Sequence, residues 1–282
     1  MKVYFSPYQL TPLKKANRLS SMEKKDGVLL KGILGDTVLF ADYFPHPELG
    51  DRHCDQFLQE FKFQKYKYDQ KVFAFLLKDV DYQNLKPKTI YNHQLWTPDE
   101  DLQAPVVKYK LQDPKDDRFI EALDRGARLR LDCNGLFSKK GFEGFWKEIS
   151  AKHRPLIEYV EDPSYDTDWG DLTAPVARDF VDGGPAPFYV YKPNCEFYPK
   201  VEGKVIFSSY LGGDLGRWHS YCELVGTGDL KLYHGIVTPG YFSETRDLFS
   251  GSYREGFNPD TMNVRRLYQD TLAQPWKLLC SI

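Results

Sequence analysis

Two short stretches, Leu129-Arg130-Leu131-Asp132-Cys133-Asn134-Gly135 and Ile157-Glu158-Tyr159-Val160-Glu161-Asp162-Pro163, indicate the fold of this chain. Each contains a strand-like run that ends in an acid, and each is then broken by a turn-forming residue. A buried parallel strand brings a carboxylate to its carboxyl-terminal rim in this way. The residues between them, 139–153, are numerous enough for a crossover helix. Two such units with acids at matching ends predict an oxygen-ligand metal site on a barrel rim, whereas the simpler interpretation is two strands with solvated acids.

Strand-like runs recur at regular intervals from residue 86 onward. They cover residues 89–93, 104–111, 122–131, 157–161, 175–179, 188–192, 204–209 and 231–238. This recurrence is typical of a parallel β/α sheet or barrel. Several gaps are too short for a full helix, so we expect an α/β fold in which a modified (β/α) barrel over residues 91–240 has trimmed helices.

The N-terminal part has a different pattern. Residues 2–10 and 28–42 are typical of strands, and the spacing of Phe57, Leu58 and Phe61 predicts a helix over about residues 51–66. We therefore expect an α+β unit over residues 1–90, with part of the tail, about 241–282, packed on it. The basic segment 10–26 is either a solvated connection or a lid whose cations meet an anionic substrate.

Composition excludes several classes of protein. The 282 residues carry a formal charge of −2, which argues against a nucleic-acid binder held by bulk electrostatics. No apolar run approaches the length of a membrane span, and we expect neither a membrane segment nor a signal peptide. The cysteines have no metal-binding or disulfide spacing, which fits reduced thiols and a cytoplasmic location; they are Cys54, Cys133, Cys195, Cys222 and Cys280.

Lys108 and Lys110 are two residues apart on a strand-like run. On a strand, both side chains point to the same face, about 6–7 Å apart. Inside a barrel, each ammonium disfavours protonation of the other, so a pKa is expected to fall toward neutrality, as a general base requires. The alternative is an amphipathic edge strand with both lysines in water.

Asp132, Glu161 and Asp179 each close a strand-like run on successive units. Three carboxylates with open coordination positions suit Mg²⁺, although a chance trio of strand-end acids is the alternative. Lys192 ends another run and is expected across the barrel mouth from Lys110.

Ser208 and Ser209 end the next run, ahead of Gly212-Gly213. Their hydroxyls and the backbone amides there suit a carboxylate, although a simple glycine turn is the alternative. These parts together predict one mechanism, in which a divalent ion grips a substrate carboxylate and a lysine removes the adjacent C–H proton. Metal stabilisation of the resulting dianion is typically worth several kcal/mol.

The ordered motifs resemble the enolase superfamily, and within it the o-succinylbenzoate synthases. The residues that carry the resemblance are Lys108-Tyr109-Lys110, Leu129-Arg130-Leu131-Asp132-Cys133-Asn134, Glu161-Asp162-Pro163, Ala177-Arg178-Asp179, Tyr191-Lys192-Pro193, Ser208-Ser209 and His234-Gly235 followed by Thr238. They stand in the family's order across residues 105–240.

The resemblance implies a capping domain, over residues 1–90 with part of the tail, on the modified barrel. It implies Mg²⁺ held by Asp132, Glu161 and Asp179. It also implies Lys110 as the base that then protonates the departing hydroxyl in a syn dehydration.

In the same resemblance, Lys192 steadies the anion, Lys108 tunes Lys110, and the substrate-binding residues are Ser208, Ser209 and Asn134. The implied partner is a small-molecule carboxylate, a cyclohexadiene carboxylate that becomes o-succinylbenzoate in menaquinone biosynthesis.

The chain departs from the family pattern near the third acid. Phe180 stands where the family usually has Glu, and few residues separate Asp179 from Lys192, so Asp171 or Asp182 is an alternative ligand. The same parts also suit an N-acylamino acid racemase, a dipeptide epimerase or a cycloisomerase of the superfamily. A third possibility is a barrel that binds a small acid without catalysis.

Overall fold

The computed structural model describes residues 1–15, 20–63, 86–164, 166, 169, 172–179, 185–193 and 200–281. Asp171, Phe180, Asp182 and Cys195 lie outside these residues. Within the described ranges, no helix has the length and apolarity needed to cross a membrane.

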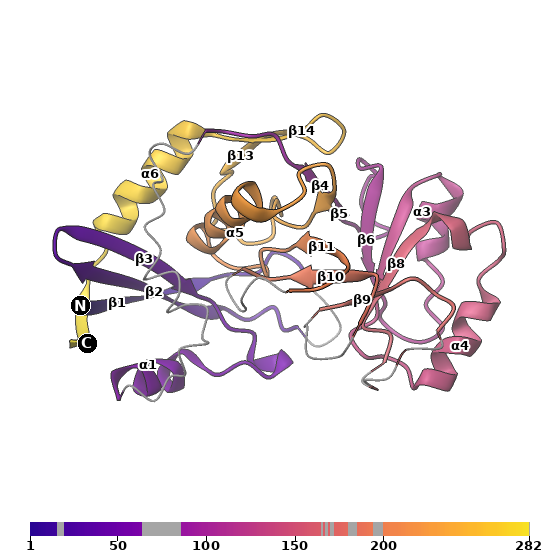
Figure 1. Ribbon diagram of the computed structural model, residues 1–282, viewed down its shortest axis with the longest axis horizontal. Coiled ribbons are helices and arrows are strands. Elements are labelled where there is room, and N and C mark those ends of the chain that lie inside the picture. Colours follow the sequence, from indigo (N-terminus) through magenta and orange to yellow (C-terminus); the bar gives the residue numbers. More distant parts are fainter. Residues whose placement is uncertain are drawn as a thin grey trace.

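An antiparallel sheet contains both ends of the chain. Its strand order is β15-β1-β2-β3, with bounds β1 (Lys2–Leu10), β2 (Lys25–Leu34), β3 (Thr37–Tyr43) and β15 (Lys277–Ser281). The turn between β2 and β3 needs Gly35, whose φ of 58° is left-handed. Because β15 pairs with β1, the N and C termini lie together (Figure 1). The boundary at residue 90 between the predicted domains stays a prediction.

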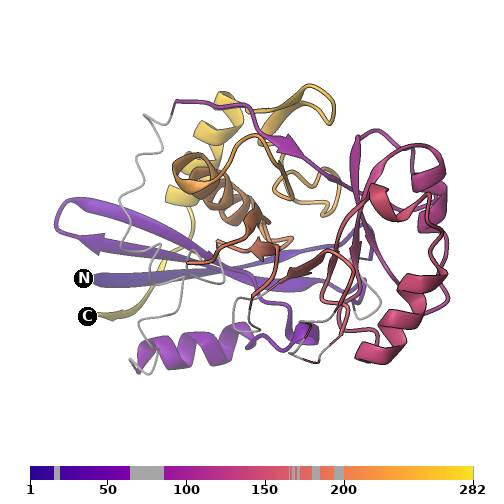
Figure 2. The same cartoon turned by 45° about the vertical axis from the view of Figure 1, so that its right-hand side comes forward.

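Two helices cover opposite faces of this sheet, α1 (Cys54–Lys62) and α6 (Thr261–Leu272), as Figures 1 and 2 show. Phe57 and Phe61 of α1 pack with Ala41 of β3. The neighbouring Phe40 points the other way, and its ring lies 5.7 Å from that of Tyr268 in α6. The helix expected over 51–66 thus begins at Cys54 and ends at Lys62 in the described part of the chain.

The second sheet is a parallel barrel, as the recurring strands predicted. Its order is β11-β10-β9-β8-β7-β6-β5. β12 pairs with β4, and a parallel bridge from Ser208 to Gly235 joins β11 to β12. Since β4 and β5 are parts of one strand interrupted at His93, these pairings close the sheet. The strands are β4 (Tyr91–Asn92), β5 (Gln94–Leu95), β6 (Val106–Lys110), β7 (Arg128–Asp132), β8 (Ile157–Glu161), β9 (Val176–Arg178), β10 (Phe188–Tyr191), β11 (Lys204–Phe207) and β12 (Tyr233–His234).

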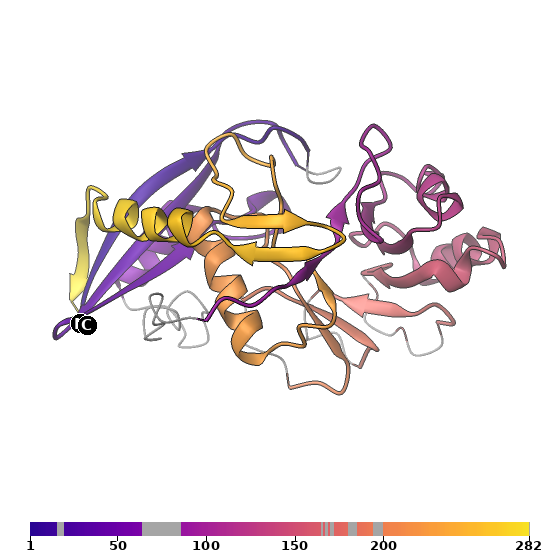
Figure 3. The same ribbon diagram turned by 90° about the horizontal axis from the view of Figure 1, so that it is seen from above.

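The barrel has few outer helices among the described residues. They are α3 (Phe119–Asp124), α4 (Lys139–Glu148) and α5 (Asp214–Thr227). Ser138 caps α4 by accepting a hydrogen bond from the Gly141 amide. Two short 3₁₀ turns are η1 (Pro47–Leu49) and η2 (Arg154–Leu156). A separate hairpin pairs β13 (Phe249–Ser252) with β14 (Gly256–Pro259), as Figure 3 shows from above. The fold is therefore a trimmed barrel with an N-terminal α+β unit.

The N-terminal unit packs directly on the barrel. Leu10 and Phe44 form a buried apolar cluster with Tyr241 and Phe242. In the basic segment expected to be a connection or a lid, Lys14 Nζ lies 2.6 Å from a Glu100 carboxylate oxygen of the barrel side. That cation therefore already binds an acid of the protein itself.

Candidate active site

The strand register places three ionisable side chains in one row. Lys110 pairs with Asp132, and Asp132 pairs with Glu161, on the neighbouring strands β6, β7 and β8. All three lie at the carboxyl ends of their strands, and parallel strands bring those ends to one rim. The acids in the two opening stretches therefore do lie side by side.

Strand alternation explains why charged groups point into this barrel. Val107 and Tyr109 of β6, like Leu129 and Leu131 of β7, belong to the apolar core under α3 and α4. Because successive strand residues face opposite sides, Lys108 and Lys110 both face inward. Each of these two lysines contacts the same oxygen, Oδ2 of Asp132, at 3.0 and 2.8 Å respectively.

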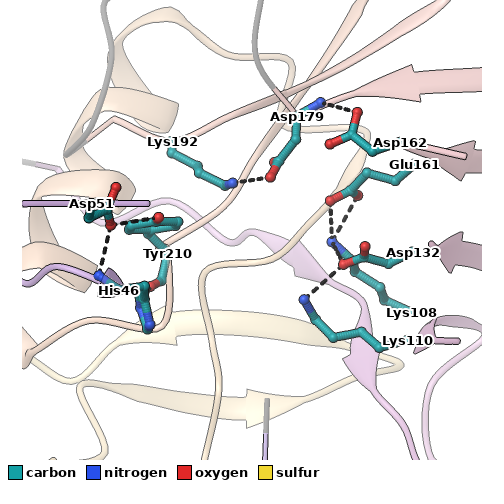
Figure 4. Close-up of polar contacts among 10 residues, drawn as sticks. All are labelled: His46, Asp51, Lys108, Lys110, Asp132, Glu161, Asp162, Asp179, Lys192 and Tyr210. Atoms are coloured by element: carbon teal, nitrogen blue, oxygen red, sulfur yellow. Dashed lines mark hydrogen bonds and ion pairs between the residues drawn. The ribbon is translucent and has the colours of Figure 1, made fainter. Parts of the chain in front are cut away.

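Lys108 is buried between two carboxylates (Figure 4). Its Nζ donates to both carboxylate oxygens of Glu161, at 2.7 and 2.8 Å. Burial alone lowers the pKa of Lys108, but the charges of Asp132 and Glu161 outweigh burial and raise the pKa well above its usual value. The expectation that the paired lysines repel each other toward neutrality is therefore wrong for Lys108, because acids surround it.

The two central acids have opposite shifts. Burial raises the pKa of Asp132, but the charges of Lys108 and Lys110 lower this pKa by more than burial raises it, so the net shift is downward. Burial raises the pKa of Glu161, Lys108 lowers it, and Asp132 with Asp179 raises it, so the net shift is upward. Asp132 is therefore the firmly ionised member of the pair, and Glu161 is the acid that a further cation would relieve.

Lys192 and Asp179 approach from the opposite side, as Figure 4 shows. Lys192 Nζ is hydrogen-bonded to Asp179 Oδ2 and also lies 4.7 Å from the centre of the Tyr210 ring. The Asp179 amide donates to Asp162 Oδ1 at 3.2 Å. The site thus has lysines on two sides with acids between them.

The predicted substrate-binding residues divide into two groups. Ser208 and Asn134 line the pocket, together with Lys108, Lys110 and Lys192. Ser209 is 1% exposed, is not among the pocket-lining residues, and its Oγ has no hydrogen-bond partner within the described ranges. The role of Ser209 as a substrate contact stays a prediction, and its hydroxyl lies behind the pocket lining.

The pocket also includes residues that the sequence reasoning missed. They are His46, Leu49, His93, Leu95, Tyr210 and Leu211, whereas Gly235 and Thr238 of the same lining belong to the motifs that carry the resemblance. His93 ends a strand-like run, which is the same signal that marked the acids. Arg130 Nη1 lies 2.9 Å from His93 Nδ1, and burial lowers the pKa of His93. Since Arg130 can only donate, the neutral ring carries its proton on Nε2. His46 has no such signal, because only folding brings its loop to the barrel.

The donor set fits Mg²⁺ in chemistry. Asp132, Glu161 and Asp179 offer the oxygen ligands that Mg²⁺ prefers, and Asp179 Oδ1 is buried with no hydrogen-bond partner among the described residues. Lys108 Nζ lies between Asp132 and Glu161 and forms an ion pair with each, which leaves one negative charge of the two without a partner from Lys108. In the described part of the chain, no three acidic, histidine or cysteine side chains converge closely enough to hold an ion.

The N-terminal unit and the barrel both match known proteins. Residues 3–75 match the family model described as the N-terminal domain of o-succinylbenzoate synthase. An o-succinylbenzoate synthase of Bdellovibrio bacteriovorus is 31% identical over 185 residues, which are 58% of this chain and 56% of that protein. The match thus spans little more than half the length of that curated relative.

Solved structures match over nearly the whole chain. The o-succinylbenzoate synthase from Thermosynechococcus elongatus BP-1, complexed with Mg in the active site, has a TM-score of 0.66 at 17% identity, covering 96% of this chain and 100% of that one. A magnesium complex of an enolase superfamily member from Roseovarius nubinhibens ISM has a TM-score of 0.67 at 13% identity, covering 100% and 95%. The muconate lactonizing enzyme from Pseudomonas putida has a TM-score of 0.65 at 12% identity, covering 94% and 98%.

These likenesses define the class of protein by its fold. The chain has the enolase-superfamily fold, a capping domain on a β/α barrel. Its sequence, over the matched parts, resembles the o-succinylbenzoate synthases.

Proposed function

We propose that this chain is a Mg²⁺-dependent lyase that forms o-succinylbenzoate by syn dehydration of a cyclohexadiene carboxylate. The observation that carries the proposal is the row formed by Lys110, Asp132 and Glu161, with Lys192 facing it from the other side. The named relative and the matched N-terminal domain support the choice of reaction. We expect the reaction to serve menaquinone biosynthesis in the cytoplasm.

In the proposed reaction, Lys110 makes both proton transfers. Its neutral amine takes the proton from the carbon next to the substrate carboxylate. The resulting ammonium then gives a proton to the hydroxyl on the neighbouring carbon, which leaves as water while the ring becomes aromatic. Because one side chain performs both transfers, they occur on the same face of the ring, and Lys110 returns to its neutral form.

The other residues act on charge and position. Asp132, Glu161 and Asp179 would hold Mg²⁺, which when bound supplies positive charge to the substrate carboxylate as the C–H bond breaks. Lys192 would steady the anion from the opposite face. Lys108 would keep Asp132 ordered beside Lys110, since both lysines share the same Asp132 oxygen.

Removing the proposed base tests this function. In the purified protein with MgCl₂, formation of o-succinylbenzoate is followed by absorbance, and Lys110→Ala is expected to lower kcat at least about 100-fold, because general-base catalysis is worth that much. The melting temperature should change little, since Asp132 is the one ion-pair partner of this ammonium among the described residues. Lys115→Ala, an exposed lysine in the loop after the same strand, is the matched control.

Other outcomes separate the remaining candidates. Turnover that is unchanged in Lys110→Ala would remove this lysine as the base. Epimerisation of an N-acylamino acid or a dipeptide by the parent protein, without dehydration, would favour the racemase or epimerase alternative, and a lactone product from a muconate would favour the cycloisomerase. Binding of the carboxylate without any turnover would favour a binding barrel.

A further inference from the structure

The turn after β11 has an unusual backbone conformation. Tyr210 and Leu211 have φ values of 55° and 49°, so two successive residues with side chains are left-handed. This conformation costs free energy for residues other than glycine, and it persists where surrounding contacts hold it. The turn therefore needs partners outside itself.

Those partners come from the loop between β3 and α1, residues 44–53, here called the cap loop. Tyr210 Oη donates to Asp51 Oδ2 at 2.8 Å, and the same oxygen accepts the His46 amide at 2.7 Å. His46 Nε2 lies 2.8 Å from the Tyr210 carbonyl oxygen. Because a carbonyl oxygen only accepts, Nε2 carries a proton and donates.

The ring of Tyr210 is held on two sides. The His46 ring meets it edge-on, with 4.7 Å between ring centres and 80° between planes. The second contact of the ring is with the Lys192 ammonium, which lies 4.7 Å from the ring centre of Tyr210. An ammonium at this distance from an aromatic ring is attracted by the ring's negative face.

We propose that Tyr210 is a positioning residue for Lys192, and that the cap loop holds Tyr210 in place through His46 and Asp51. Figure 4 shows the hydrogen bonds that Asp51 makes with His46 and Tyr210, and the bond between Lys192 and Asp179. The contact of the Lys192 ammonium with the Tyr210 ring connects these two groups. The inference rests on the proposed function only for the catalytic role of Lys192. The proposal gives the cap loop a part in catalysis, because this loop fixes Lys192 of the barrel through Tyr210, although Lys192 is far from the loop in the sequence.

One test measures Lys192 without using activity. Trace acetylation of the whole protein in saturating MgCl₂, followed by peptide mass spectrometry, reports how accessible each lysine is. Tyr210→Leu is expected to raise the acetylation rate of Lys192 about fivefold, because the ring contact is lost. Lys204, whose ammonium lies 5.4 Å from the Phe188 ring centre, is the internal control and should keep its rate.

A second test separates positioning from general destabilisation. Tyr210→Leu is expected to lower kcat about tenfold while KM changes less than about twofold, since Lys192 acts on the anion rather than on substrate binding. Tyr210→Phe keeps the ring but loses the bond to Asp51, so its kcat should fall only about threefold, and Asp51→Asn should match it. Tyr221→Phe, which removes a 2.9 Å bond from a tyrosine hydroxyl of α5 to the Lys88 carbonyl and touches neither the cap loop nor Lys192 in that bond, should keep the parent's kcat.

The outcomes are distinct. Parental acetylation of Lys192 in folded Tyr210→Leu would overturn the proposal, as would an unchanged kcat in that variant. Should Tyr210→Leu not fold, the same two measurements on Tyr210→Phe and Asp51→Asn decide, and equality with Tyr221→Phe would contradict the proposal. Absence of dehydratase activity in the parent would defeat the proposed function, while the acetylation result would still decide the role of Tyr210.

Discussion

At the scale of single residues, the site depends on how charges are paired inside a barrel. Lys108 and Lys110 share one oxygen of Asp132, and Lys108 also bonds both oxygens of Glu161. A buried charge is tolerated only with such partners. Asp179 differs, because its Oδ2 bonds Lys192 while its Oδ1 has no partner among the described residues. Asp179 therefore has an oxygen available for a cation.

The available oxygen of Asp179 leads to a metal-binding prediction. Asp179→Asn is expected to weaken Mg²⁺ binding, measured by isothermal titration calorimetry, at least about tenfold, because a hard cation loses an ionised oxygen ligand. Asp166→Asn is the matched control, since Asp166 lies in the loop before β9 and accepts hydrogen bonds from Lys139 and Ser164 instead. Equal Mg²⁺ affinity in the two variants would exclude Asp179 as a ligand and leave Asp171 and Asp182 to be tested in the same way.

At the scale of elements, local patterns predicted the barrel better than they predicted its surroundings. Acid-terminated runs placed Asp132 and Glu161 on neighbouring strands, because parallel register follows from the pattern of the strands themselves. The same local reasoning missed His46, because nothing in its own loop records that Tyr210 lies beside it. The pKa of Lys108 was also not foreseen to rise, since the sequence predicted both acids on the neighbouring strands but not their direct bonds to this ammonium.

The contact between β3 and α5 gives a prediction for pH. Asp42 accepts hydrogen bonds from Tyr8 Oη at 2.7 Å and from the Gly216 amide at 3.0 Å. Burial raises its pKa from 3.8 to about 6, although these hydrogen bonds lower it in part. The folded protein therefore holds a proton that the unfolded chain has already released between about pH 4 and 6. The stability that Asp42 contributes is thus full below about pH 4 and falls as pH rises to 6.

Urea unfolding of the parent and of Asp42→Asn at several pH values measures this contribution. From pH 4 to 7, the parent should lose up to about 3 kcal/mol of unfolding free energy relative to Asp42→Asn, because each unit of pKa shift is worth about 1.36 kcal/mol. Asp36→Asn, on the exposed turn before β3, is the control. A parent-minus-variant difference that is constant with pH would show that Asp42 stays ionised.

At the scale of the whole molecule, the pocket is completed by two parts of the chain that fold around each other. β15 returns to pair with β1, and the cluster of Leu10, Phe44, Tyr241 and Phe242 joins the N-terminal unit to the barrel. Phe44 begins the cap loop that reaches Tyr210. The packing of this cluster should therefore matter for the site as well as for stability.

The contact between Phe44 and Phe242 gives a way to separate these two effects. Their rings are 5.5 Å apart and meet edge-on. Phe242→Ala and Phe142→Ala each remove a buried ring, 3% and 1% exposed, and each should lower the unfolding free energy by about 3–5 kcal/mol. Phe142 belongs to a different apolar cluster, the core between the barrel and the helices α3 and α4, which contains no residue of the cap loop. We therefore expect only Phe242→Ala to change kcat and KM, because it alone loosens the loop that carries His46 and Asp51. Denaturant unfolding and steady-state kinetics check this, with Phe→Leu at both positions where the alanine variants do not fold. Equal kinetic parameters for the two variants would mean that the cap loop is held without this cluster.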